Sequence, residues 1–435
     1  MTRQLKTWTT LGLAALSSAT LAQATQLPAG NPPTLYPSVV LTQIDAEGEG
    51  GGAKTEEAGE GGESGGSAIP AYELGSTDPN AYQYEARPQI EAYVDLVHAA
   101  YLKSASDANA MKIAIDAFLA APTAETMSAA RQAWVAARPA YLRTEAFRFY
   151  DGPIEGKEAN INSWPLNEAY IDYVEGHPNA GLVNDSTAPL EIKKLERANQ
   201  KDDEADVTVG WHAIEFLLWG QDLPEAGPGN RPYTDYIAGQ GNNDRRRLYL
   251  QLVTNELVHE LEELAEAWET QEKDSYAAKF LSLPPREAIG RMVNGMAILA
   301  GYQFRQVQVD AGIDSKNHDL EESRFSATTR QNFTATFDGL RQVWSGDSEG
   351  VTRPGLDGLV FGIDAATAGK VSDLFTTVET KLNAIGDPWN KVLAAPEGSP
   401  ELQAAEDLVT ALEALSGGLA EAGNKLGVLV LLPGG

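Results

Sequence analysis

From Arg87 onward, apolar residues recur every three or four positions, the spacing that puts them on one face of an α-helix. Alternating apolar and polar runs rich in β-branched residues are scarce, so a large sheet is excluded. We therefore expect an all-α protein. After a first helix near Arg87, the periodicity predicts helices over 107–120, 123–149, 189–198, 208–220, 244–273, 285–309, 322–345, 367–385 and 400–423.

The N-terminal part of the chain differs from this helical region in composition. Arg3 and Lys6 precede a short apolar stretch that ends in small residues at Ala24, which is the order of a secretory signal over residues 1–24. An uncleaved membrane anchor is the alternative. Residues 25–84 are Pro-rich and then acidic and Gly/Glu-rich. We expect them to form a disordered linker, because they bury too little apolar surface to offset the entropy of ordering.

The helical region, residues 85–425, is interrupted by the segment 220–241, which is rich in Gly, Pro, Asn and Asp. We interpret this segment either as a long functional loop or as the joint between two helical bundles, about 85–225 and about 240–425. No run after the signal has the length of a transmembrane helix. We therefore expect an exported, soluble mature chain in the periplasm or cell envelope, with outer-membrane association left open.

The charge and the cysteine count exclude several classes of function. The 435 residues include 33 Lys and Arg against 62 Asp and Glu, which gives a net charge of −29. A nucleic acid or an anionic lipid surface requires a basic face, so neither is an expected partner. The absence of cysteine excludes disulfides, Cys-based zinc sites, iron–sulfur clusters and thiol catalysis. Metal ions and other cations remain compatible partners.

One predicted helix, Gly210 to Gly220, carries His212 and Glu215 among side chains that are otherwise apolar. A helix that is apolar all round is a buried helix, and burying an imidazole and a carboxylate is costly unless each has a partner. Because the two positions are three apart, they share one face. They can pair with each other, with another polar side chain, or with a metal ion. We favour metal binding or catalysis over a purely structural pair.

Two further histidines have a Glu three residues later, which shows how common this spacing is in an acidic chain. His259 stands among acidic residues on several faces, and we interpret it as part of a solvated helix face. His318 lies in a polar stretch after Gly312, and we interpret it as part of a surface loop or a helix start. Neither is expected to be a ligand.

A catalytic zinc site normally has three protein ligands, so His212 and Glu215 require a third from elsewhere in the chain. Glu145 is a candidate, because it stands on a predicted helix among apolar residues. The alternative for Glu145 is an ion pair with Arg138 or Arg148 at the edge of the core. The zincin motif H-E-x-x-H and the ferritin-like order Glu-x-x-His are both absent around His212.

The segment Gly210 to Leu223 resembles the imelysin family of bacterial exported proteins, whose hallmark is G-x-H-x-x-E. The likeness covers roughly residues 85–425 and includes Gly227–Tyr236, Arg138, Tyr141, Glu145–Phe149, Gly152–Pro153 and Trp164–Leu166. The resemblance implies a two-bundle helical fold with the motif near the domain interface. It also implies a cell-envelope location and metal binding linked to iron uptake or to iron-regulated expression. Some family members are classed as metallopeptidases.

The segment from Glu321 to Thr329 departs from the family pattern, which in many members reads Glu-His-Ser-Cys-Phe-Ser-Asp-Asn-Thr. Glu321 matches it. The four departures are Glu322, Arg324, Ala327 and Thr328, which replace His, Cys, Asp and Asn. We therefore prefer binding to hydrolysis.

Our first hypothesis is an exported metal-binding protein of iron acquisition. Its ligands would be His212, Glu215 and Glu145, with Asp222 or Glu321 completing the set. Imidazole and carboxylate suit a divalent or trivalent ion, with iron favoured and zinc as the alternative. The partners would be the ion or a chelate, and envelope iron-transport components. The alternatives are a metallopeptidase with Glu215 as general base, and a non-catalytic structural or interaction protein.

Overall fold

The structure is a computed structural model that describes residues 72–76, 78, 80–222 and 227–432. The predicted signal over 1–24 and most of the predicted linker lie outside the described residues, so both stay predictions. Within the described residues the regular secondary structure is almost entirely helical, and the strands are only two residues long. The prediction of an all-α fold is confirmed.

The longer helices match the predicted ranges within a few residues at most ends. They are α1 (Arg87–Ala120), α2 (Ala124–Leu142), α7 (Gly210–Trp219), α8 (Asn243–Ala267), α10 (Pro285–Ile298), η3 (Leu299–Asp310), α12 (Thr329–Ser345), α14 (Ala365–Asn383) and α16 (Pro400–Lys425). Of these, η3 is a π-helix that continues α10 without a break. The pattern over 107–120 belongs to α1, which runs as one helix of 34 residues.

Shorter elements connect these helices. They are η1 (Arg143–Phe147), α3 (Glu158–Asn162), α4 (Glu168–Ile171), α5 (Gly181–Asn184), α6 (Ile192–Ala198), η2 (Tyr233–Tyr236), α9 (Tyr276–Leu281), α11 (Ala311–Ser315), η4 (His318–Leu320), α13 (Leu356–Ile363) and α15 (Trp389–Leu393). The strands β1 (Glu73–Leu74) and β2 (Val428–Leu429) pair antiparallel, so the start of the described chain lies against its end.

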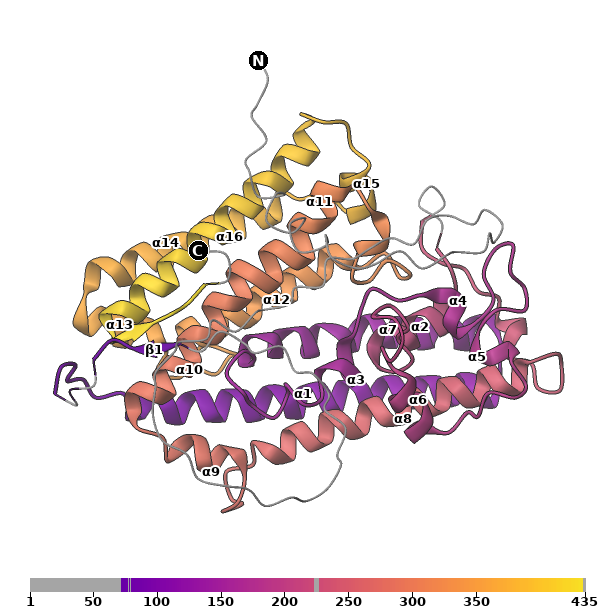
Figure 1. Ribbon diagram of the computed structural model, residues 1–435, viewed down its shortest axis with the longest axis horizontal. Helices are drawn as coiled ribbons and strands as arrows, with labels where there is room; N and C mark the ends of the chain where they lie inside the picture. The colour runs from indigo at the N-terminus through magenta and orange to yellow at the C-terminus, as the bar shows by residue number, and fades with distance from the viewer. Residues whose placement is uncertain (1–71, 77, 79, 223–226, 433–435) are drawn as a thin grey trace, which may run out of the picture. The chain divides into compact units, whose positions relative to one another are not determined.

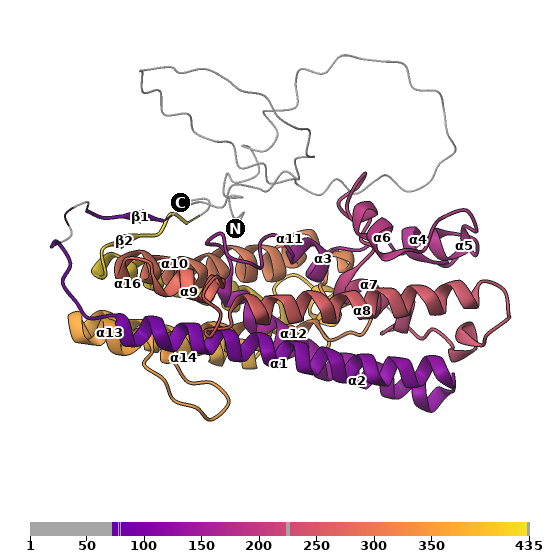
Figure 2. The ribbon, with the colours of Figure 1, turned by 90° about the horizontal axis from the view of Figure 1, so that it is seen from below.

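Two sets of helices pack through apolar faces. Helix α1 lies along both α2 and α8, and α7 packs between α2 and α8 (Figures 1 and 2). Helix α16 packs against α14, α10 and η3, while α12 contacts both η1 and α2 (Figure 1). Of the candidate residues, Glu145 lies in η1, and His212 and Glu215 lie in α7. The division into bundles of about 85–225 and about 240–425 stays a prediction.

Helix α7 is buried at every position, as its apolar sequence predicts. The ring of Trp211 packs edge-on against Trp134 of α2, with their centroids 6.0 Å apart. The helix starts at Gly210, whose φ of +85° favours glycine, and a Cβ there would lie 2.4 Å from the carbonyl oxygen of Ile161. The glycine of the motif is therefore needed for the close approach of α7 to α3.

The predicted helix over 322–345 begins later than expected, at Thr329. The preceding residues form a turn in which the Thr328 N–H donates to the carbonyl oxygen of Ser323, and Ala327 has a φ of +56°. This left-handed conformation interrupts the helix. Among the described residues, no helix combines the length and the apolar character needed to cross a membrane.

Candidate functional site

His212 and Glu215 form a buried pair on α7, with side-chain exposures of 1% and 0%. The Nδ1 of His212 lies 3.1 Å from Oε2 of Glu215. The other carboxylate oxygen, Oε1, accepts hydrogen bonds from the backbone N–H of Ser326 at 2.8 Å and from its hydroxyl at 2.7 Å. Both oxygens of Glu215 are therefore engaged by the protein itself.

Arg138 of α2 contacts the Nε2 side of the His212 ring. Its Nη2 lies 3.3 Å from Nε2 of His212 and donates to Oε1 of Glu322 at 2.8 Å. An arginine can only donate, so Nε2 accepts and a neutral His212 carries its proton on Nδ1, facing Glu215. Burial, together with the Arg138 charge, holds the pKa of His212 well below its usual value. His212 is therefore neutral in the folded protein.

The carboxyl of Glu215 prefers its protonated form. Burial raises its pKa from 4.5 to about 8, and the negative charge of Asp222 acts in the same direction. The two hydrogen bonds from Ser326 and the charge of Arg138 oppose this shift without cancelling it. A buried group with such a perturbed pKa is a candidate for function.

Glu145 of η1 lies in a separate buried group. It accepts hydrogen bonds from Asn162 Nδ2 at 3.3 Å and from Gln308 Nε2 at 3.2 Å, and it lies 3.7 Å from Arg148 Nη1. Burial, and secondly the charge of Glu322, raise its pKa to about 8. Of the two alternatives weighed for its pairing, the Arg148 contact is observed. The π-helix η3 supplies Gln308, which the sequence did not mark as a site residue.

A third group forms around His318, which the sequence placed in a surface loop or at a helix start. It lies in η4, and its Nδ1 is 2.6 Å from Oε1 of Glu321, while its Nε2 contacts Oδ2 of Asp222. Its side chain is 15% exposed, and the two carboxylates are nearly buried. Burial lowers the pKa of His318, but the hydrogen bonds to Asp222 and Glu321 outweigh it and raise the pKa to about 9. His318 is therefore a candidate site residue that the sequence interpretation had set aside as part of a surface loop or a helix start.

The departures from the family pattern lie in this same region. Glu322 pairs with Arg138, and its other oxygen accepts from Asn332 Nδ2 at 2.9 Å. Arg324 forms ion pairs of 2.7 Å with Glu168 and with Asp319, and it lies 3.7 Å from Asp222. The segment 318–329 therefore contributes side chains to the His318 group and also to the His212 pair.

The five predicted metal ligands do not form one ligand set in the described arrangement. The structure brings His212 together with Glu215, and Asp222 and Glu321 together at His318, whereas Glu145 is hydrogen-bonded to Asn162 and Gln308. Among the described residues, no three or more His, Asp and Glu side chains form a group with metal-holding geometry. At His318, Glu321 and Asp222 approach opposite ring nitrogens, so the two carboxylates do not point toward one common position for an ion.

Comparisons with known proteins identify the family. The chain matches the family model described as imelysin over residues 97–416, and it belongs to this family. It is 24% identical over 333 residues to iron-regulated protein A of Synechococcus elongatus, an alignment that covers 74% of this chain and 82% of the relative. The resemblance inferred from the G-x-H-x-x-E segment is confirmed.

Solved structures share the fold. An iron-regulated protein A precursor from Parabacteroides distasonis has a TM-score of 0.63 at 20% identity, covering 82% of this chain and 98% of its own. An imelysin-like protein from Psychrobacter arcticum has a TM-score of 0.54 at 14% identity, covering 81% and 99%. At these identities the likeness shows the fold alone.

Proposed function

We propose that this protein is exported to the cell envelope and binds iron there as cargo in iron acquisition. We assign binding to the His318 group, His318 with Asp222 and Glu321, next to the buried pair of His212 and Glu215. The observation that carries the proposal is an imidazole held between two nearly buried carboxylates, at a position that solvent still reaches. The relatives named iron-regulated protein A support the choice of iron.

The donor chemistry of this group suits iron, since imidazole nitrogen and carboxylate oxygen bind Fe, with Zn as the competitor. Without metal, His318 carries a proton at neutral pH, because its pKa lies at about 9. A cation bound to one ring nitrogen would replace the proton there. Because Glu321 and Asp222 approach opposite nitrogens, both carboxylates would have to turn to the same side of the ring to share the ion with it. Affinity is therefore expected to rise with pH, with protons released on binding.

The Glu215 carboxyl interacts electrostatically with the His318 group. Asp222 helps to raise the pKa of Glu215, so each group responds to the charge of the other. Arg138 blocks Nε2 of His212 at 3.3 Å, which argues against His212 as the first ligand. We infer that the His318 group contacts the ion. His212 and Glu215 do not contact it, and they act on it through the charge of Asp222.

The test is metal content after equilibrium dialysis of the full chain against Fe(II) without oxygen, measured by plasma mass spectrometry. Wild type is expected to hold close to one iron, and Asp222→Asn and Glu321→Gln are expected to lose it. The matched control is Glu263→Gln, because Glu263 is an exposed carboxylate of α8 that contacts Lys157 and His259 and no residue of the His318 group. Full occupancy in Asp222→Asn, or loss confined to Glu215→Ala, contradicts the assignment to the His318 group.

The metallopeptidase hypothesis, with Glu215 as general base, stays a prediction. Metal-dependent cleavage of an unfolded protein that disappears in Glu215→Ala would support it. The partners that the iron proposal requires are the ion or a chelate, and an envelope iron-transport component that receives it.

A further inference from the structure

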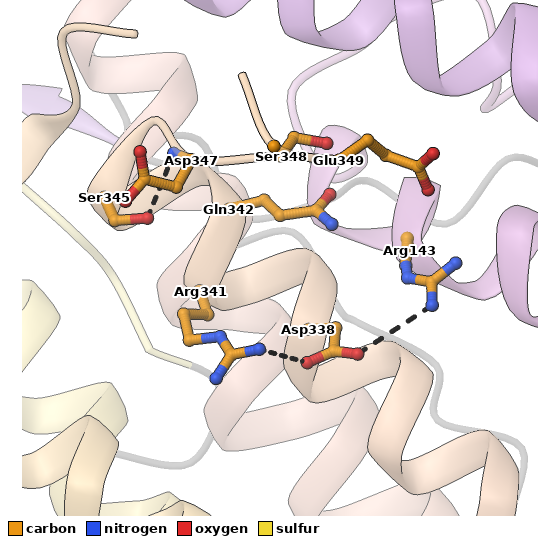
Figure 3. A pocket seen from close by; sticks show the side chains of 9 residues that line it. Arg143, Asp338, Arg341, Gln342, Ser345, Asp347, Ser348 and Glu349 are labelled. Carbon is orange, nitrogen blue, oxygen red and sulfur yellow. Dashed lines mark hydrogen bonds and ion pairs between the residues drawn. The ribbon is translucent and has the colours of Figure 1, made fainter. Parts of the chain in front are cut away.

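A small pocket of about 210 Å³ lies where α1 and α2 meet the loop that follows α12. It shares Arg143, Gln342 and Glu349 with a more open pocket of about 480 Å³. Figure 3 shows the larger pocket, with the Gln342 amide directed toward Arg143 and Glu349. Neither pocket includes a residue of the His212, Glu145 or His318 groups.

We call the apolar part of the lining of the smaller pocket its floor. Ala99 and Ala100 of α1, Ala140 of α2 and Val351 of the loop line it, and none of these side chains carries a polar atom. The volume lies below the usual range for small-molecule sites, so an occupant must be small. A flat apolar body of about the size of a benzene ring fits these limits.

The rim of the same pocket is basic, in contrast to the chain as a whole. Lys103, Arg143 and Arg353 line it together with a single carboxylate, Glu349, although the chain carries a net charge of −29. Lys103 is paired with Asp107 at 2.5 Å on the surface of α1. The two arginines therefore determine what the pocket attracts.

Both guanidinium groups have donors left over. Arg143 lies 3.9 Å from Asp338, at the outer limit of an ion pair, whereas Arg341 holds the same carboxylate at 2.8 Å (Figure 3). Nη1 of Arg353 is buried and has no hydrogen-bond partner among the described residues. Solvent does not reach this nitrogen in the described structure, so an anion in the pocket accepts from it only after the Arg353 side chain turns. Such a contact would relieve the free-energy cost of a buried donor without an acceptor.

The loop that carries Arg353 is fixed by its own backbone. The N–H of Arg353 donates to the Gly346 carbonyl at 3.2 Å, and Ser348 and Val351 exchange hydrogen bonds of 3.0 and 2.8 Å. Gly346 has a φ of +75°, and a Cβ there would lie 2.2 Å from the carbonyl oxygen of Arg353. The pocket is therefore formed before any ligand arrives, which lowers the entropic cost of binding.

We propose that this pocket binds a small organic carboxylate with an apolar body. The carboxylate accepts hydrogen bonds from Arg143 and Arg353, and the body lies on the alanine floor. The proposal is independent of the iron proposal, since it uses none of the same residues. It assigns this protein a second ligand, of a chemical class that the His318 group would not hold.

The probe is benzoate, titrated into the metal-free full chain and followed by saturation-transfer NMR, with benzamide as the neutral isostere. We expect saturable benzoate binding with a Kd on the order of 1 mM, and no binding of benzamide. Arg353→Gln and Arg143→Gln are each expected to weaken benzoate binding at least tenfold. Arg87→Gln is the matched control, because Arg87 lines neither pocket and is an exposed arginine paired with Glu91 at 2.6 Å.

Several results would overturn the proposal. Equal binding of benzamide would show that charge is not recognised, and absence of saturation in wild type would show that the pocket is not a site. Wild-type affinity in both Arg353→Gln and Arg143→Gln would place the ligand elsewhere. Thermal unfolding of each variant checks the fold, and Arg143, which is 29% exposed, gives a test if Arg353→Gln does not fold.

Discussion

Replacing Glu215 with Gln tests the electrostatics of the buried pair directly. The pKa of Glu215 is 4.5 in an unfolded chain and about 8 in the folded protein, mainly because of burial. The folded state therefore binds one proton more than the unfolded state between these pH values, and stability falls as the pH rises through this window. The shift corresponds to at most about 5 kcal/mol, at 1.36 kcal/mol per pH unit. Gln resembles the neutral carboxyl and cannot lose a proton.

The assay is urea unfolding of wild type and Glu215→Gln at intervals from pH 4.5 to 9. The difference in unfolding free energy is expected to move in favour of the variant by several kcal/mol across this window. Using the difference removes the contributions of Glu145 and His318, which titrate in both proteins. Glu263→Gln, at an exposed helix position, is expected to follow wild type throughout. Parallel curves for wild type and Glu215→Gln would refute the assignment of a raised pKa to Glu215.

Further predictions address the surroundings of the site. Arg138→Leu leaves Glu322 buried without its cation, and we expect it to lower the unfolding free energy by about 3–5 kcal/mol at pH 7; a loss below about 1 kcal/mol in urea unfolding would argue against it. Gly210→Ala is expected to destabilise by more than about 2 kcal/mol, because its Cβ would overlap the Ile161 carbonyl; an unchanged Tm would contradict this. Iron binding at pH 7 is expected to release protons as His318 loses its charge, which calorimetry in two buffers of different ionisation enthalpy detects as a buffer-dependent heat.

The helices could be predicted from the sequence because their signal is local. The apolar period of α1 and α8, and the apolar run of α7, lie within single segments of the chain. The start of α12 could not be predicted from the sequence. The pattern over 322–328 is helical, but Glu322 and Ser326 in this segment form hydrogen bonds with Arg138 and Glu215 instead. Ser326 turns its N–H to Glu215 instead of continuing a helix.

The contacts of the candidate residues follow from the sequence only where the partners are close along the chain. The pairing of His212 with Glu215 could be predicted because the two share one face of a helix whose other side chains are apolar. The contact between His318 and Asp222 joins residues 96 positions apart in the sequence, so no local sequence pattern predicts it. The spacing of His318 to Glu321 was available as a signal, but the polar stretch around it favoured a surface interpretation.

The ion pair of Arg138 and Glu322 constrains how this protein can change in evolution. Each residue alone is a buried charge, since both side chains are 1% exposed or less, and either single substitution leaves the other uncompensated. Joint replacement by apolar residues of similar size removes both charges together, so the two positions are strongly epistatic. A lineage can therefore leave this arrangement by changing both residues, but each single step on the way passes through a less stable protein.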